Sequence, residues 1–140
     1  MTVRMVRGSC YCGAVQIEVE PPAEEVGHCH CANCRRAFGT GIYSYAWFPD
    51  EQVRVVSGDE HLTRHVNDLG RQRRFCKICG TTMLYSTPRY PGTSVNLACL
   101  LDSLGQLPDR HVYADRAPDW LPITDELLRL GGESGEEPLA

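Results

Sequence analysis

The sequence lacks several features that would each point to a particular class of protein. Its 140 residues carry a net charge of −4, whereas a nucleic-acid-binding protein normally has an excess of basic residues. The one local basic cluster, Arg71, Arg73 and Arg74, is interpreted as a solvated strand face. No apolar run approaches the roughly 20 residues of a membrane-spanning helix, and the charged start MTVRMVRGS lacks the apolar stretch of a secretory signal. These absences predict a cytoplasmic protein without nucleic-acid or membrane partners.

Helical periodicity is also scarce, whereas short strand-like runs bounded by turn residues are frequent. In Val15–Val19, for example, apolar and polar residues alternate, and Pro21-Pro22 follows. Many short strands separated by turns predict a mainly β domain. The expected strands are Val15–Val19, Ile42–Phe48, Val53–Val56, Leu62–Val66, Gln72–Phe75, Met83–Tyr85, Val95–Leu101 and His111–Ala114.

Two short segments have helical character. Tight helical turns are expected over Ala32–Phe38, and Thr124 is a suitable N-cap for a C-terminal helical turn over Asp125–Leu130. The final residues 131–140, GGESGEEPLA, are polar, acidic and glycine-rich, which predicts a disordered tail. No repeat or linker divides the rest, so residues 1–130 are expected to form one domain.

Cysteine is the residue that the sequence does have in quantity. Seven of the eight cysteines form three tight clusters: Cys10-x-Cys12, Cys29-x-Cys31-x-x-Cys34 and Cys76-x-x-Cys79. In a reducing compartment, clustered thiols bind metal more often than they form disulfides. Four plus three thiols would hold two zinc ions, one in a closed structural site and one with an open coordination position. The eighth, Cys99, lies on the apolar face with Val95 and Leu97 and is expected to be buried as a small hydrophobic residue.

Spacing alone leaves the grouping of these clusters open. Cys76–Cys79 is followed by Gly80 and has the form of a zinc knuckle, and Cys10-Tyr11-Cys12-Gly13 is a shorter version with the same trailing glycine. Alternatively, Cys31 and Cys34 could join the knuckle in a generic zinc ribbon that holds one ion and has no chemistry. That grouping would leave three thiols without a site: Cys10, Cys12 and Cys29.

Three cysteine motifs resemble one known family. The runs GSCYCG at residues 8–13, CHCANCR at 29–35 and RFCKICGT at 74–81 are similar to the glutathione-dependent formaldehyde-activating enzymes, a family that includes centromere protein V. The ending HVY at 111–113, followed by Trp120 and ITDEL at 123–127, resembles the family's C-terminal signature. The resemblance covers about residues 5–130 in order.

The resemblance implies a fold, a grouping of ligands and an activity. The fold would be a β-tent of several coiled, mainly antiparallel sheets held by zinc. Cys10, Cys12, Cys76 and Cys79 would hold a structural zinc, and Cys29, Cys31 and Cys34 the second ion. Family members are described as condensing formaldehyde with glutathione to S-(hydroxymethyl)glutathione, or more broadly as carbon–sulfur lyases.

A zinc ion with three thiolate ligands and an open position suits a substrate thiol, which it would hold as the nucleophilic thiolate. Arg35 and Arg36 follow Cys34 and either pair with substrate carboxylates or lie in a solvated turn. Trp120 either walls a substrate pocket or fills the core. His30 is expected to point away from its neighbouring ligands, with a supporting role as the alternative.

Two functions of another class compete with the enzyme. One is a non-catalytic protein-interaction module, because the implied fold also occurs in a zinc-containing chaperone of small GTPases. The other is a thiol redox or zinc sensor that uses Cys29, Cys31 and Cys34. Three ligands rather than four at the second site favour the enzyme. The oligomeric state, the true thiol and the true aldehyde are left open by the sequence.

Overall fold

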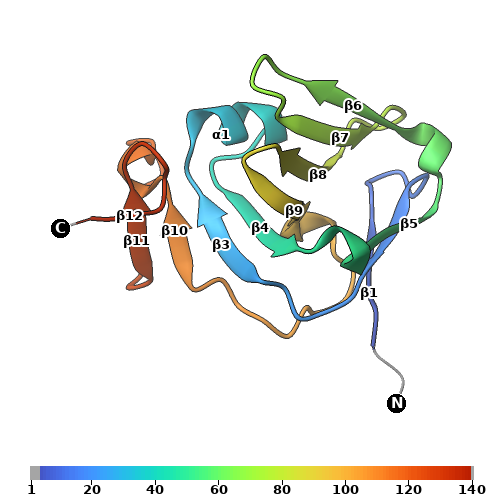
Figure 1. Ribbon diagram of the computed structural model, residues 1–140, viewed down its shortest axis with the longest axis horizontal. Helices are drawn as coiled ribbons and strands as arrows, with labels where there is room; N and C mark the ends of the chain where they lie inside the picture. Colours follow the sequence, from blue (N-terminus) through green and yellow to red (C-terminus); the bar gives the residue numbers. More distant parts are fainter. Residues whose placement is uncertain (1–3, 140) are drawn as a thin grey trace. The chain divides into compact units, whose positions relative to one another are not determined.

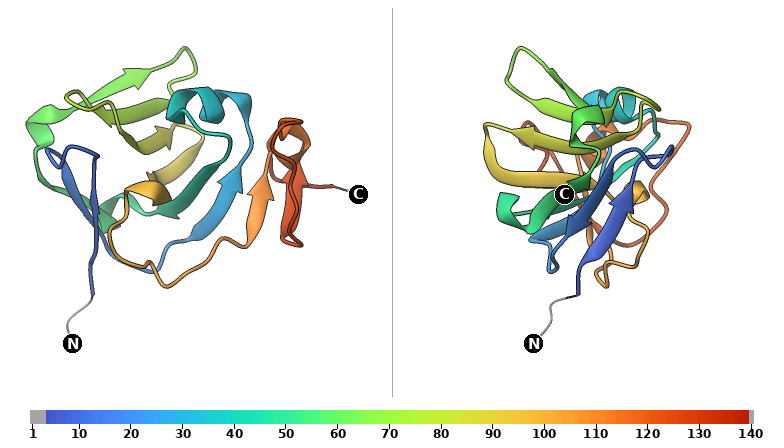
Figure 2. Two further views of the ribbon diagram at one scale, coloured as in Figure 1. Left: turned by 180° about the vertical axis from the view of Figure 1, so that it is seen from behind. Right: turned by 90° about the vertical axis from the view of Figure 1, so that its right-hand side faces the viewer.

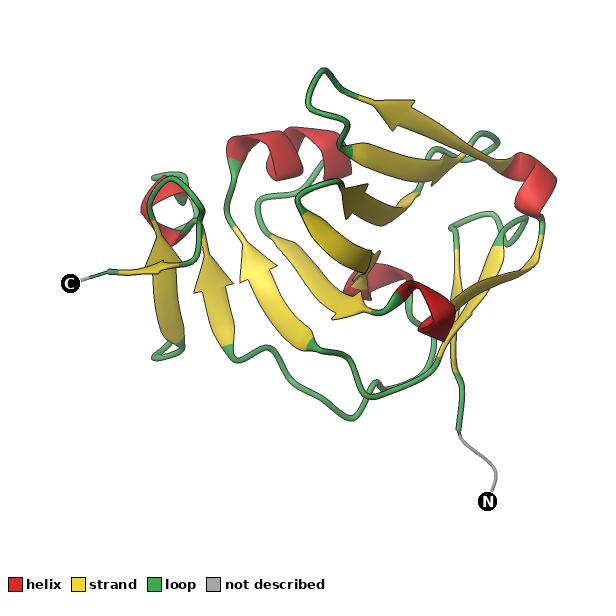
Figure 3. Ribbon diagram, in the orientation of Figure 1, coloured by secondary structure: helices red, strands yellow, loops and turns green. Residues whose placement is uncertain are grey.

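The protein is described here by a computed structural model that covers residues 4–139. Strands dominate these residues, and the helical segments are short (Figure 3). The mainly β prediction is therefore confirmed. Within the described residues, no helix is long and apolar enough to cross a membrane. In chain order the elements are β1 Val6–Ser9, β2 Gln16–Val19, β3 Glu25–Cys29, α1 Ala32–Phe38, β4 Tyr43–Phe48, η1 Asp50–Gln52, β5 Val53–Ser57, η2 Asp59–His61, β6 Leu62–Val66, β7 Gln72–Cys76, β8 Thr82–Thr87, β9 Tyr90–Asn96, η3 Leu97–Cys99, β10 Arg110–Val112, η4 Ala114–Arg116, β11 Leu128–Gly131 and β12 Glu137–Pro138, where η marks a 3-10 turn.

The chain folds into two compact units that interleave along the sequence. Unit 1 combines the chain up to Glu25 with Ala46–Gln106, and unit 2 combines Val26–Tyr45 with the chain from Leu107 onward. One boundary along the chain falls within β3, after Glu25, and another within β4, after Tyr45. Each unit contains one complete set of the clustered cysteines, so the two candidate sites can be described separately.

Unit 1 is built from two antiparallel groups of strands (Figure 1). Strands β1, β2 and β5 form one group, and β6, β7, β8 and β9 pair in succession in the other. The alternation of apolar and polar residues explains why β2 is a strand: Ile17 and Val19 are buried, while Gln16 and Glu18 are partly exposed. The core of this unit includes Ile17, Phe48, Met83, Leu84 and Val95, all almost fully buried.

Unit 2 contains a smaller sheet in the order β12-β11-β10-β3, with the first half of β4 next to β3. Strand β10 pairs in parallel with both β3 and β11, so the sheets are mainly antiparallel, as the resemblance implied, but not entirely so. Strands β3 and β10, light blue and orange, lie side by side in the left view of Figure 2. The parallel pairing is possible because a long stretch of chain separates β3 from β10. Helix α1 follows β3 directly, as the sequence predicted.

The predicted C-terminal helical turn over Asp125–Leu130 is wrong. Leu128–Gly131 forms strand β11, whose backbone pairs with β10 on one side and β12 on the other. Asp125 does not begin a helix; its carboxylate accepts a hydrogen bond from the amide of Leu127 at 3.0 Å. Strand pairing with β10 and β12 thus outcompeted the local helix signal. The tail segment predicted to be disordered contributes β12, which closes the hairpin with β11.

The predicted strand Val95–Leu101 is also corrected in part. Strand β9 ends at Asn96, and the side chain of Asn96 accepts a hydrogen bond from the amide of Ala98 at 3.1 Å. This cap starts the 3-10 turn η3, so the apolar alternation continues without a strand. Cys99 lies in η3 and is 4% exposed, which confirms its prediction as a buried residue.

Glycine is required where η2 begins. Gly58 has φ of 79°, and a Cβ built on it would lie 1.7 Å from the carbonyl oxygen of Ala14. Gly105 has the same φ of 79° but nothing within 4 Å of such a Cβ. A side chain at Gly105 would therefore cause backbone strain alone, whereas one at Gly58 would cause the same strain and a steric clash.

We expect Gly105→Ala to lower the free energy of unfolding by roughly 1–2 kcal/mol, the cost of a left-handed alanine. Gly58→Ala should cost more than about 4 kcal/mol, because the carbonyl of Ala14 belongs to the backbone and cannot move aside alone. Denaturant unfolding of the two variants and the unaltered protein measures both losses. Equal losses in the two variants would contradict the predicted clash.

Candidate metal centre

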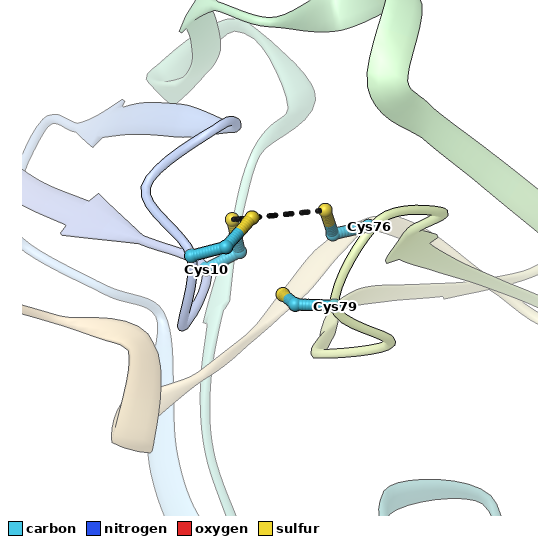
Figure 4. Close-up of side chains that lie close together, drawn as sticks. Cys10, Cys76 and Cys79 are labelled. Carbon is cyan, nitrogen blue, oxygen red and sulfur yellow. Dashed lines mark hydrogen bonds between the residues drawn. The ribbon is translucent and has the colours of Figure 1, made fainter.

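Four thiols from two distant turns of unit 1 meet at one point (Figure 4). Cys10 and Cys12 come from the turn after β1, and Cys76 and Cys79 from the end of β7 and the turn after it. All four sulfur atoms lie within 4.8 Å of one another. This is the grouping that the family resemblance implied, and it differs from the zinc-ribbon alternative.

The spacing of these sulfurs fits a tetrahedral metal ion. Zinc–sulfur bonds of about 2.3 Å place two thiolates of a tetrahedron about 3.8 Å apart. The Sγ atoms of Cys10 and Cys12 are 3.7 Å apart, and those of Cys12 and Cys76 are 3.8 Å apart. The donor set is therefore suited to zinc, with Cys10 and Cys76 on the buried side of the cluster and Cys12 exposed.

Short-range hydrogen bonds hold both turns in place. In the second turn, the amide of Gly80 donates to the carbonyl of Cys76 at 2.7 Å, and Gly80 adopts φ of 83°. Thr81 joins the two turns, because its hydroxyl accepts from the amide of Tyr11 at 3.0 Å and lies 3.2 Å from Sγ of Cys79. Thr81 is in the recognised motif, but the sequence alone did not show that it has this role.

The electrostatics of the cluster favour thiolates at two positions. The hydrogen bond from Thr81 lowers the pKa of Cys79 to about 5. Burial raises the pKa of Cys10, but hydrogen bonds from the amide of Val15 and from neighbouring thiols more than offset this, and the net pKa is lowered. Metal binding would then release the protons that the other thiols of the group still hold.

We expect Cys76→Ala to abolish cooperative folding, because a zinc ion held by the four-thiol cluster would supply on the order of 10–16 kcal/mol to the domain. Cys99→Ala is the matched control, since Cys99 is buried in the same unit but stands outside the four-thiol cluster. The control should lose only about 1–2 kcal/mol and keep the metal. Metal analysis and thermal unfolding monitored by circular dichroism report both effects. A folded, metal-free Cys76→Ala protein would show that the cluster is dispensable.

The second set of cysteines lies around the junction of β3 and α1 in unit 2. Cys29 ends β3, Cys31 is the residue before α1, and Cys34 lies within the helix. The helix is short and ends at Gly39, which adopts φ of 64°. Cys29 and Cys34 are buried in a core cluster with Tyr43, Tyr45 and Val112, against which Cys31, Phe38 and Tyr113 pack.

These three thiols interact with one another. Hydrogen bonding with the thiols of Cys31 and Cys34 raises the pKa of Cys29 well above its usual range. The thiols of Cys29 and Cys34 donate to Cys31 and lower its pKa strongly, so Cys31 is the thiolate of the set. Within residues 4–139, however, the four-thiol cluster is the only group of potential ligands placed closely enough to hold a metal ion. A second metal ion is therefore a proposal and is argued below.

The other predicted site residues have contacts of their own. The Nε of Arg35 donates to the carbonyl of His30 at 3.2 Å, and this hydrogen bond stabilises the turn between β3 and α1. Arg36 donates to Oδ1 of Asn33 at 3.1 Å on the exposed side of α1. Trp120 is 66% exposed, so the alternative that it fills the core is wrong. Its role in substrate binding stays a prediction.

A buried network beside the second cysteine set was missed by the sequence reasoning. Nε2 of His30 lies 2.7 Å from Nδ1 of His111, and Nε2 of His111 lies 2.9 Å from Oδ1 of Asp125. His30 is fully buried and His111 is 2% exposed. No local spacing in the sequence connects His111 to His30. The prediction that His30 points away from its neighbouring ligands agrees with this contact.

Proton positions in the network follow from its chemistry. Hydrogen bonding to His111 lowers the pKa of Asp125, so the carboxylate is ionised and Nε2 of His111 must donate to it. Burial lowers the pKa of His30 to about 4, which makes its ring neutral near pH 7. The remaining ring nitrogens, Nε2 of His30 and Nδ1 of His111, share one hydrogen bond. The network thus ties the β3–α1 turn to strand β10 and the loop at Asp125.

We expect His111→Ala to destabilise the protein by about 3 kcal/mol, because it leaves a cavity and removes the hydrogen-bond partner of the buried Nε2 of His30. His65→Ala is the control; His65 is exposed on β6, and its loss should change stability by less than about 0.5 kcal/mol. Chemical denaturation of the two variants gives both values. If His111→Ala lowers the free energy of unfolding no more than His65→Ala does, the network does not stabilise unit 2.

The fold and the four-thiol cluster define a mainly β protein with a cysteine site shaped for a metal ion. The family model of the glutathione-dependent formaldehyde-activating enzymes matches residues 5–116. The chain therefore belongs to this family, as its motifs indicated.

Individual relatives agree with the family assignment. A protein of Halomonas elongata, provisionally named a glutathione-dependent formaldehyde-activating enzyme, is 32% identical over 127 residues, which span 85% of this chain and 81% of the relative. An uncharacterised lyase of Schizosaccharomyces pombe is 27% identical over 79 residues, 56% of each chain. The crystal structure of a Rhodobacter sphaeroides protein matches with a TM-score of 0.57 and 33% identity, covering 73% of this chain and 97% of that one.

Proposed function

We propose that this protein is an enzyme that adds the thiol of glutathione to formaldehyde, forming S-(hydroxymethyl)glutathione, and that the same site reverses the reaction as a carbon–sulfur lyase. The observation that carries the proposal is the interacting set Cys29, Cys31 and Cys34, in a chain of this family. The name of the fission-yeast relative, a lyase, supports the broader reaction class.

We infer two zinc ions with different roles. Cys10, Cys12, Cys76 and Cys79 would hold a structural ion with no position left for a substrate. Cys29, Cys31 and Cys34 would hold the second ion, and their soft, partly ionised donor set fits zinc. When bound, that ion supplies an open position at which a substrate thiol loses its proton near neutral pH.

Residues around Cys29, Cys31 and Cys34 shield this site and hold it in position for an addition reaction. The helix α1 brings Cys34 back toward Cys31, and Phe38 and Tyr43 stack at 3.7 Å beside the cysteines, which limits access of water to them. The bonds of Arg35 and His30 fix the turn that carries Cys31. In the reaction the thiolate sulfur bonds to the aldehyde carbon, the C=O π bond breaks, and the proton lost by the thiol ends on the oxygen.

Cobalt substitution makes binding of the thiol visible. We expect added glutathione to increase the sulfur-to-cobalt charge-transfer absorption, because its thiolate becomes a new ligand at the second site. S-methylglutathione, which has no ionisable thiol, should leave the band unchanged. Cys31→Ser should abolish the response, whereas Cys99→Ser, a change outside both sets, should keep it.

The catalytic step needs a separate measurement. Exchange of formaldehyde with its glutathione adduct, followed by NMR, should be faster with the zinc-loaded protein than in buffer and should return to the buffer rate with Cys31→Ser. A spectral response without faster exchange would make the protein a carrier of thiol adducts. The absence of any response to glutathione would overturn the proposed function and favour a protein-interaction module.

A further inference from the structure

The basic cluster of the sequence has no part in either cysteine site, and the structure divides it between two faces of β7. Arg73 is 8% exposed and stacks over the ring of Tyr85 at 4.8 Å. Arg74 points to the opposite face, where it lines a cavity of about 720 Å³ in unit 1. The interpretation of this cluster as a plain solvated face therefore does not describe Arg74.

The guanidinium of Arg74 is partly desolvated and lacks a partner. Within residues 4–139 its side chain forms no hydrogen bond or ion pair, and burial lowers its pKa despite the opposing charges of Asp50 and Asp59. Arg64 lies directly opposite on β6, and like charges in that register repel each other. An anion bound at Arg74 would give the guanidinium a partner and would reduce its repulsion with Arg64.

The same cavity also contains a carboxylate. Asp50 lines it and accepts a hydrogen bond from the hydroxyl of Thr93 at 2.7 Å through Oδ1. Asp50 acts on Arg74 through its charge, but the two side chains form no ion pair. Two opposite charges that line one cavity without touching suit a ligand that carries both a positive and a negative group.

Further hydrogen-bond donors line the cavity. Nη1 of Arg64 donates to Oε1 of Gln72 at 3.0 Å, which orients the amide of Gln72 and leaves its NH₂ group available to a ligand. Ser86 and Tyr90 add hydroxyl groups to the lining. These donors favour the carboxylate end of a ligand near Arg74, and the oxygen of Asp50 that Thr93 does not use favours an ammonium group at the other end.

We propose that this cavity binds the zwitterionic head of an α-amino acid, with the carboxylate on Arg74 and the ammonium group on Asp50. The head has two sources, a free amino acid or the γ-glutamyl end of glutathione. The second source rests on the proposed function, whereas binding of a free amino acid does not. Neither source requires a metal ion at the cavity.

NMR titration of the zinc-loaded, ¹⁵N-labelled protein tests the proposal with three probes: L-alanine, N-acetyl-L-alanine and S-methylglutathione. L-alanine should shift the amide signals of residues that line the cavity, and N-acetyl-L-alanine, which lacks the ammonium group, should bind more weakly. S-methylglutathione carries the γ-glutamyl head but no thiol, so its binding is independent of the cobalt experiment above. Tighter binding of S-methylglutathione than of L-alanine would identify glutathione as the source of the head. Tighter binding of L-alanine would identify a free amino acid as the ligand.

Variants separate the two charges. Arg74→Gln should weaken binding of L-alanine about tenfold or more, because a charged hydrogen-bond partner is lost. Asp50→Asn should weaken L-alanine but leave N-acetyl-L-alanine unchanged. Arg54→Gln, which removes an exposed arginine elsewhere in unit 1, is the matched control and should bind all probes normally. Arg74→Lys keeps the charge and checks that any loss in Arg74→Gln does not come from misfolding.

The proposal is overturned if no probe at millimolar concentration shifts the cavity signals. It is also overturned if Arg74→Gln, folded by circular dichroism, binds L-alanine as tightly as the unaltered protein. Equal binding of L-alanine and N-acetyl-L-alanine would contradict the assigned role of Asp50. Failure here leaves the cobalt response to glutathione untouched, so the two proposals stand or fall separately.

Discussion

Four sulfur atoms from two distant turns converge within 4.8 Å in unit 1, and the arrangement of this unit depends on that convergence. One turn follows β1, which belongs to the group β1, β2 and β5, and the other follows β7, which belongs to β6–β9. A bound metal ion would therefore join the two groups of strands at a single point. Unit 1 also has an apolar core, but its strands are short, and short strands alone give limited stability.

The cysteines of unit 2 are placed differently, because they are part of the core itself. Cys29 and Cys34 are buried among Tyr43, Tyr45 and Val112, and Cys31 packs against that cluster. A site made of core residues is held rigidly, which suits the positioning of a reacting group. The network of His30, His111 and Asp125 adds a polar support that joins the β3–α1 turn, strand β10 and the loop at Asp125.

Several features were predictable because their causes are local. The alternation of Ile17 and Val19 defined β2, and the turn residues around Leu62–Val66 defined β6. The helix α1 was also foreseen over its full length. Prediction failed where a distant partner decided the outcome, as at Leu128–Gly131, where pairing with β10 and β12 replaced a helical turn. It failed again at Asn96, whose side-chain cap ended β9 early.

By itself, the sequence determined the mainly β class, the family and which cysteines belong to metal-type clusters, because motif spacing and alternation are properties of neighbouring residues. Only the tertiary structure brought Cys10 and Cys12 to Cys76 and Cys79, joined His30 to His111, and set Arg74 and Asp50 in one cavity. Each of these contacts connects residues whose separation along the chain carries no periodic signal. Their distance is decided by how the strands pair and pack.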